Sequence, residues 1–167
     1  MNIDKYLKNA TVTDKKNLCT LLNIPDLRLK YEYIYDLVCE QLDKDFRKYN
    51  YCDFRNDKCI CQRTSKKVAH DSMGCCYTFK NSKLTGFPVD TKLCKYLQNG
   101  SCSIQCISCK LFTCSYLKKN KIKFSPNDFF LIKVFFNRKQ KSYIKNAFFT
   151  GRNEIIDNLL KMNTKLE

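Results

Sequence analysis

The stretch "LRLKYEYIYDLVCEQLDKDF", residues 27–46, sets the fold class of this chain. Its apolar side chains recur at intervals of three and four residues, which place them on one face of an α-helix. They are Leu27, Tyr31, Ile34, Tyr35, Val38, Leu42 and Phe46. A shorter run with similar spacing precedes it at Leu18, Leu21 and Leu22. Residues 1–51 are therefore predicted to be helical.

The last third of the chain is also predicted to be helical. "SPND", residues 125–128, places a serine cap, a proline and an acidic residue in the order that begins a helix, and "FFLIKVFF" follows almost at once. Asn137 and Gln140 have the spacing of a second N-terminal cap. Thr150 and Gly151 then interrupt the pattern before a last short helix.

Cysteines separate these two helical parts. Ten of the twelve lie between Cys52 and Cys114. A chain of 167 residues has the length of one domain. We predict a single, mainly α domain with three parts: a helical N-terminal part (1–51), an irregular, cysteine-rich and metal-stapled centre (52–115), and a basic helical C-terminal part (116–167).

The cysteine content also bears on the compartment. Twelve cysteines would indicate a disulfide scaffold in a secreted protein. However, the first residues lack the basic head, apolar core and cleavage site of a secretory signal. The longest apolar stretch, "DFFLIKVFFN", is about half the length that a membrane span needs. We expect a cytoplasmic protein without membrane association, whose reduced thiols bind metal.

The densest group of cysteines is "CSIQCISCKLFTC", residues 102–114. If this stretch forms one helix, its four sulfurs share a face, but Cys102 and Cys114 lie about 18 Å apart along the axis. Zinc holds its sulfur ligands about 4 Å from one another. Cys106 and Cys109 can therefore share one ion, and the remaining ligands must come from elsewhere in the chain.

The candidate ligands are cysteines of the centre, together with one histidine. The main candidates for zinc or an iron–sulfur cluster are Cys59, Cys75, Cys76, Cys94, Cys102, Cys106, Cys109 and Cys114, and the secondary ones are Cys52, Cys61 and His70. His70 is the only histidine, and its other interpretation is a solvated loop residue. Cys19 and Cys39 lie within the N-terminal helical pattern and are predicted to pack in the core.

Three pieces of the centre resemble a known family. They are "GCC" at 74–76, the loop "CKYLQNGSC" from Cys94, and "CKLF" from Cys109. They resemble the zinc- or iron-chelating cysteine-cluster family, small bacterial proteins of the C-x2-C-x2-CC type. The resemblance covers only the central part of the chain and implies binding of zinc or an iron–sulfur centre. The sequence departs from the family in that Cys59 and Cys61 lie well before Cys75.

The primary function hypothesis is a metal-binding protein with a structural, sensory or chelating role. The alternative is a zinc-stapled adaptor for nucleic acid or protein that uses the basic C-terminal helices. Residues 116–167 hold twelve Lys and Arg against four Asp and Glu, a net charge of +8. The basic residues cluster beside aromatic side chains, a combination typical of contacts with a phosphate backbone. The two clusters are Lys118, Lys119, Lys121 and Lys123, and Arg138, Lys139, Lys141 and Lys145.

A third hypothesis is an iron–sulfur enzyme. Cys102, Cys106 and Cys109 have the C-x3-C-x2-C spacing of the radical S-adenosylmethionine enzymes. Those enzymes require a barrel of alternating strands and helices, which this chain does not predict. The sequence also lacks a second histidine and a glycine-rich phosphate loop. The sequence therefore favours a protein that is not an enzyme.

Overall fold

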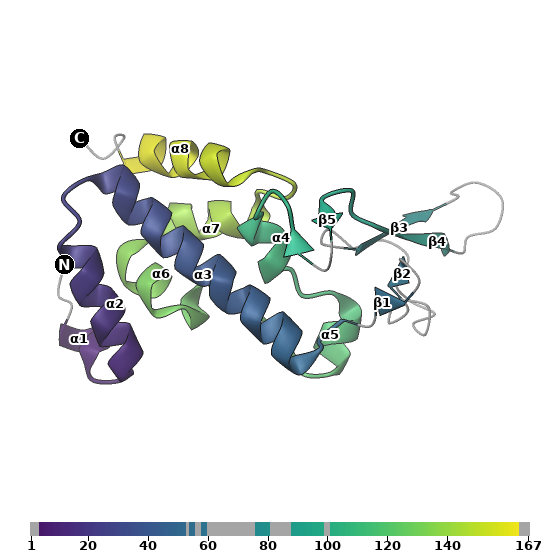
Figure 1. Ribbon diagram of the computed structural model, residues 1–167, viewed down its shortest axis with the longest axis horizontal. Coiled ribbons are helices and arrows are strands. Elements are labelled where there is room, and N and C mark those ends of the chain that lie inside the picture. The colour runs from purple at the N-terminus through teal and green to yellow at the C-terminus, as the bar shows by residue number, and fades with distance from the viewer. Residues whose placement is uncertain are drawn as a thin grey trace.

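Helix α3 (Leu27–Tyr49) is the longest element of the protein and crosses its helical part (Figure 1). The structure is a computed structural model, and it describes residues 4–52, 54–55, 58–59, 76–80, 88–98 and 101–163. Two helices precede α3: α1 (Asp4–Leu7) and α2 (Val12–Leu22). Five follow the central part: α4 (Ile107–Leu111), α5 (Ser115–Lys119), α6 (Phe130–Phe135), α7 (Arg138–Asn146) and α8 (Arg152–Asn163). The mainly helical fold with helical N- and C-terminal parts is confirmed.

Local capping residues begin several of these helices. Thr11 and Asp14 form a reciprocal capping box at α2, in which the Thr11 hydroxyl accepts the Asp14 N–H at 3.1 Å. The Asp26 carboxylate accepts the Leu29 N–H at 2.8 Å and begins α3. Each cap satisfies an N–H group that the first turn of a helix leaves without a partner.

The predicted C-terminal caps are confirmed, with one difference. Ser125 begins a short 3₁₀ turn, η1 (Pro126–Asp128), and α6 starts only after it. Asn137 and Gln140 form a capping box at α7, with both hydrogen bonds at 2.9 Å.

Short strands lie between α3 and α4. They form three antiparallel pairs. These are β1 (Phe54–Arg55) with β2 (Lys58–Cys59), β3 (Cys76–Lys80) with β4 (Pro88–Leu93), and β5 (Leu97–Gln98) with β6 (Ser101–Cys102). These hairpins were not predicted, because the sequence analysis treated the centre as irregular.

One hydrophobic core joins α3 to the C-terminal helices. Its buried members are Leu18, Leu21, Tyr31, Ile34, Tyr35, Val38, Cys39, Leu42, Ile107, Leu111, Leu131, Ile132, Phe136, Ile144, Ile155, Ile156 and Leu159. The predicted apolar face of α3 is therefore largely confirmed, whereas Leu22 and Leu27 are 53% and 40% exposed. Cys39 lies in the core as predicted. The same prediction is wrong for Cys19, which is exposed because it lies on the outer side of α2.

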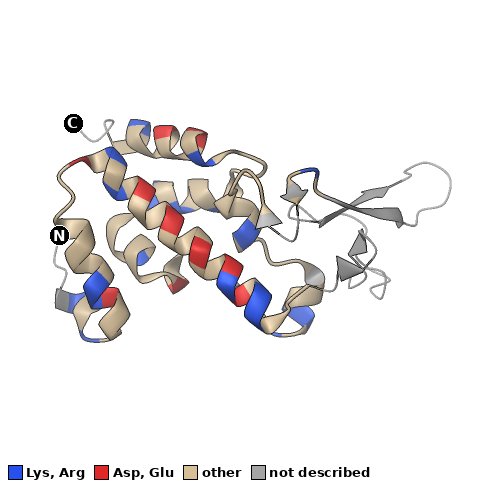
Figure 2. Cartoon of the chain, viewed as in Figure 1, with Lys and Arg blue, Asp and Glu red and all other residues tan. Residues whose placement is uncertain are grey.

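Ion pairs join α8 to α3 at the surface. Arg152 binds both carboxylate oxygens of Asp36, at 2.6 and 2.7 Å, and Arg28 binds Asp157 at 2.6 Å. Figure 2 shows the acidic residues spaced along α3. These exposed pairs contribute little stability individually. Among the described helices, none has both the length and the apolar character needed to cross a membrane.

The stretch 102–114 does not form one helix. Cys102 ends β6, the chain turns at Gln105, and α4 covers only 107–111. Gln105 has a left-handed backbone with φ of 49°, which a helix cannot contain. Phe112 is extended, and its ring packs edge-to-face on Phe148 with centroids 5.8 Å apart. The single helix that was assumed for the sulfur spacing is therefore not formed.

Candidate thiol site at helix α4

Three cysteine side chains meet beneath the start of α4. Cys102, Cys106 and Cys109 form one buried cluster, and Ile104 and Phe148 pack against it. Cys106 is fully buried, and the other two are each 7% exposed. The chain reaches this arrangement by leaving β6, turning, and entering α4, so the three sulfurs gather without a continuous helix.

Hydrogen bonds from two separate segments reach the sulfurs. The Cys106 N–H donates to Cys102 Sγ at 3.4 Å. The Phe149 N–H, from the loop between α7 and α8, donates to Cys109 Sγ at 3.4 Å. Backbone N–H groups directed at sulfur favour its negatively charged form. The site therefore suits thiolates better than thiols.

Cys106 is the thiol most strongly affected. The hydrogen bond from the Cys109 side chain lowers the pKa of the Cys106 thiol to about 6, and the backbone N–H groups of Cys109, Thr150 and Phe149 add to the effect. Burial acts in the opposite direction. The Ala147 carbonyl lies 3.4 Å from Cys106 Sγ and can accept a hydrogen bond from the thiol form. On balance the groups that donate to Cys106 Sγ hold the pKa of this thiol below its ordinary value.

Backbone strain is found on both sides of the cluster. Gln105 and Phe149 have positive φ angles of 49° and 58°, although neither is glycine. Such conformations cost about 1 kcal/mol or more each, and they concentrate at functional sites. A left-handed residue also directs neighbouring N–H groups toward one anion. The fold therefore maintains two unfavourable turns that bring N–H groups to the sulfurs.

Tyr35 of α3 supports this turn from below. Its hydroxyl donates to the Gln105 carbonyl at 2.6 Å and accepts the Ile107 N–H at 3.1 Å. Cys39 Sγ, one helical turn further along α3, lies 3.6 Å from the same carbonyl. Tyr35 is buried, and burial raises its pKa far above the ordinary value for tyrosine. Its neutral hydroxyl thus fixes both neighbours of Cys106.

We expect Tyr35→Phe to lower the free energy of unfolding by about 2 kcal/mol, because the Ile107 N–H is left buried without a partner. The Gln105 carbonyl keeps its contact with Cys39. Urea unfolding measures the loss. Tyr33→Phe is the matched control on the same helix, since the Tyr33 hydroxyl makes only a long 3.5 Å bond to Asn17. Equal losses in the two variants would contradict the role of Tyr35.

We also expect the reduced, metal-free protein to show a thiolate absorbance step near pH 6 in ultraviolet titration, because the pKa of Cys106 is about 6. Cys106→Ala should remove the step. Cys39→Ala is the control and should keep it, because burial raises the pKa of the Cys39 thiol to about 12. A parent protein with no ionisation below pH 8 would contradict the assignment, since the ordinary pKa of a thiol is 9.0.

The same pKa shift makes stability depend on pH. Folding lowers the pKa of Cys106 from 9.0 to about 6, so the unfolded chain binds its proton more tightly. The stabilisation is complete above pH 9 and decreases as the pH falls through about 6. The difference in unfolding free energy between the parent and Cys106→Ala should therefore shrink over this range.

The other candidate ligands lie in several places. Cys94 and Cys114 are buried but are outside the cluster. Cys59 lies in β2 and Cys76 in β3. Cys52 is half-buried. Cys61, His70 and Cys75 lie outside the described residues.

Cys94 lies just before the last hairpin, whose second strand ends at Cys102. Leu97 pairs with Cys102, and beyond this pair the Ser103 N–H donates to the Tyr96 carbonyl at 2.7 Å. Cys94 itself lies in the short connection between β4 and β5, two residues before Tyr96. It is buried and is therefore the first candidate to join the three clustered cysteines.

The donor set is suited to a soft metal ion, although the described side chains do not form a complete cage. Zinc and iron–sulfur centres use sulfur ligands that accept hydrogen bonds from backbone N–H groups, and the cluster offers three buried sulfurs of this kind. Within the described residues, no group of three or more Cys, His, Asp or Glu side chains has the geometry to hold a metal ion. None of the eight cysteines with described side chains forms a disulfide.

The fold and the site define a mainly helical protein with a buried thiol cluster. Comparisons of the chain with protein-family models, with curated proteins and with solved structures find no match. The function of the cluster must therefore follow from its own geometry and chemistry.

Proposed function

We propose that this protein binds zinc or an iron–sulfur centre through cysteine thiolates, in a structural, sensory or chelating role. The observation that carries the proposal is the buried cluster of Cys102, Cys106 and Cys109, in which backbone N–H groups donate to two of the sulfurs. A buried thiolate without a cation is costly, and metal ligation removes that cost. The resemblance of the central cysteines to the chelating family supports the same function.

In this proposal, Cys102, Cys106 and Cys109 supply three thiolates and Cys94 is the first candidate for the fourth. A bound cation would supply positive charge to this sulfur group. The chain's own residues position the sulfurs: Tyr35 fixes the turn before α4, and the Phe149 N–H donates to Cys109 Sγ. Such N–H···S bonds tune the affinity and the potential of thiolate-bound metals.

The deciding experiment is elemental analysis of protein purified without oxygen, combined with visible absorbance. Colourless protein with stoichiometric zinc identifies a zinc site, whereas iron, sulfide and broad visible absorbance identify a cluster. We expect Cys109→Ser to lose metal and thermal stability together, because ligation and folding are coupled. Cys19→Ser is the control, since Cys19 is exposed on α2 and should retain both properties.

Two outcomes would contradict the proposal. One is a well-folded parent protein that contains neither zinc nor iron. The other is a Cys109→Ser variant with unchanged metal content.

A further inference from the structure

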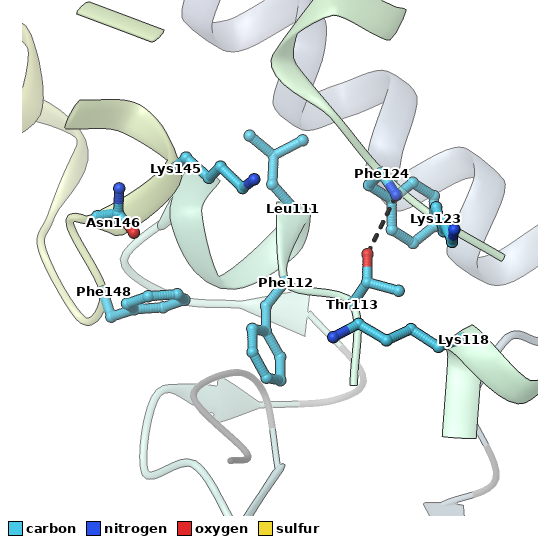
Figure 3. A pocket seen from close by; sticks show the side chains of 9 residues that line it. All are labelled: Leu111, Phe112, Thr113, Lys118, Lys123, Phe124, Lys145, Asn146 and Phe148. Carbon is cyan, nitrogen blue, oxygen red and sulfur yellow. Dashed lines mark hydrogen bonds between the residues drawn. The ribbon is translucent and has the colours of Figure 1, made fainter. Parts of the chain in front are cut away.

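A separate pocket with a volume of about 510 Å³ opens beside the thiol site. The α4–α5 connection, the segment that follows α5 and the C-terminal end of α7 form its walls (Figure 3). Three lysines and three phenylalanines make up most of its lining: Lys118, Lys123, Lys145, Phe112, Phe124 and Phe148. Its volume lies within the range of small-molecule sites.

The charged residues that line this pocket are all positive. All three lysines are exposed, and no carboxylate lines the pocket. Within the described part of the chain, none of the three forms an ion pair. Figure 3 shows the side chains of Lys118 and Lys145 reaching toward the pocket from opposite walls. The like charges of these lysines repel one another, and an anion placed among them removes this repulsion.

The neighbouring pocket provides a comparison within the same molecule. It has a volume of about 580 Å³ and shares Lys123 and Phe124 with the first pocket, but Asp14, Asp45 and Asp128 also line it. These carboxylates offset its positive charge. Anion binding is therefore expected only on the side of Phe124 that faces Lys118 and Lys145.

Aromatic rings lie beneath the lysines. Phe112 and Phe148 are half-buried, and their rings meet edge-to-face at 82° with centroids 5.8 Å apart. Each ring therefore keeps a face that its partner does not cover. A flat ligand ring can stack on such a face, while an attached phosphate reaches the ammonium groups.

We propose that this pocket binds a nucleotide moiety, with its phosphate on Lys118, Lys123 and Lys145 and its base against Phe112 and Phe148. Phosphate alone would leave the aromatic wall unused, and an uncharged aromatic ligand would leave the lysines unneutralised. Lysine–phosphate contacts combined with base–aromatic stacking are the two components of sequence-independent nucleotide recognition. The moiety is either a free nucleotide or one unit of a single strand. This inference does not depend on metal binding.

The test uses the full-length protein as purified, with adenosine diphosphate, inorganic phosphate and a labelled oligothymidylate as probes. We expect adenosine diphosphate or the oligonucleotide to bind more tightly than phosphate, with an affinity that decreases as salt increases. Saturation by adenosine diphosphate identifies the free nucleotide as ligand, and binding of the oligonucleotide alone identifies a single strand. No binding of either at low salt, or equal binding of phosphate, would overturn the proposal.

Variants distinguish binding in the pocket from nonspecific electrostatic attraction to the basic surface. Phe112→Leu should weaken binding of the base-bearing probes about tenfold and leave phosphate binding unchanged.

Lys145→Gln should weaken binding of the probes. It should also reduce the slope of the logarithm of affinity against the logarithm of salt concentration by about one. Lys139→Gln removes the same charge from α7 at an exposed position outside the pocket and is the matched control. Equal losses in Lys139→Gln and Lys145→Gln would show nonspecific attraction and overturn the assignment. Thermal unfolding of each variant verifies its fold.

Discussion

The Asp43→Ala variant is expected to lose about 3 to 5 kcal/mol of unfolding free energy. Asp43 on α3 pairs with Lys110 on α4, whose side chain is only 3% exposed. Without the carboxylate, the ammonium group is buried without a counter-charge. Breaking one partner of a buried pair is costly for this reason, even though the intact pair contributes little net stability. Urea unfolding monitored by circular dichroism measures the loss.

Two further variants test this explanation. The double variant Asp43→Leu with Lys110→Met removes both charges and should regain most of the loss, since an apolar pair of similar volume has no desolvation cost. Glu40→Ala disrupts the exposed Glu40–Lys44 pair on the same helix and should change stability by less than about 1 kcal/mol. If the double variant is as unstable as Asp43→Ala, the buried charge is not the cause.

Gln140→Ala is expected to lower the free energy of unfolding by about 3 kcal/mol, because the Gln140 side chain both caps α7 and makes hydrogen bonds inside the core. Its Oε1 accepts the Asn137 N–H and caps α7, whereas its Nε2 donates to the Tyr31 hydroxyl at 2.6 Å and to the Leu159 carbonyl at 3.4 Å. The side chain is buried, so alanine leaves these partners without hydrogen bonds inside the core. Thermal and urea unfolding both report this loss.

Asn137→Ala is the matched control for Gln140. It removes the other half of the capping box and should lower the free energy of unfolding by about 1 kcal/mol, the usual contribution of a helix cap. The additional loss in Gln140→Ala then measures the interior hydrogen bonds. Equal effects would mean that Gln140 acts only as a cap and that its contacts with Tyr31 and Leu159 contribute nothing.

The contacts of α3 explain how the thiol site is positioned. Tyr35, Cys39 and Asp43 follow one another at four-residue intervals and therefore lie on one face of α3. All three contact the segment 105–110: Tyr35 and Cys39 at Gln105, and Asp43 at Lys110. Ser108 adds an anchor on the other side, where its hydroxyl donates to the Ile144 carbonyl at 2.7 Å. Helix α4 has only five residues and depends on these contacts, since so short a helix is unstable by itself.

The sequence named Cys102, Cys106 and Cys109 within a larger set of candidate ligands, and the structure brings these three together. The argument that separated Cys114 from Cys102 assumed one continuous helix, which the structure does not contain, although Cys114 does lie outside the cluster. That these cysteines bind metal stays a prediction. The contributions of Tyr35 and Phe149 were missed, because nothing in their local sequence distinguishes them from ordinary core and loop residues.

The sequence by itself determined the helical parts and some of their caps. Caps such as Asn137 with Gln140, and the apolar face of α3, depend on residues three or four positions apart, which local spacing records directly. Only the tertiary structure decided where α4 begins and which groups surround Cys106. Those contacts join residues about 40 to 70 positions apart, and it is their combined energy that holds the chain in the strained turn at Gln105.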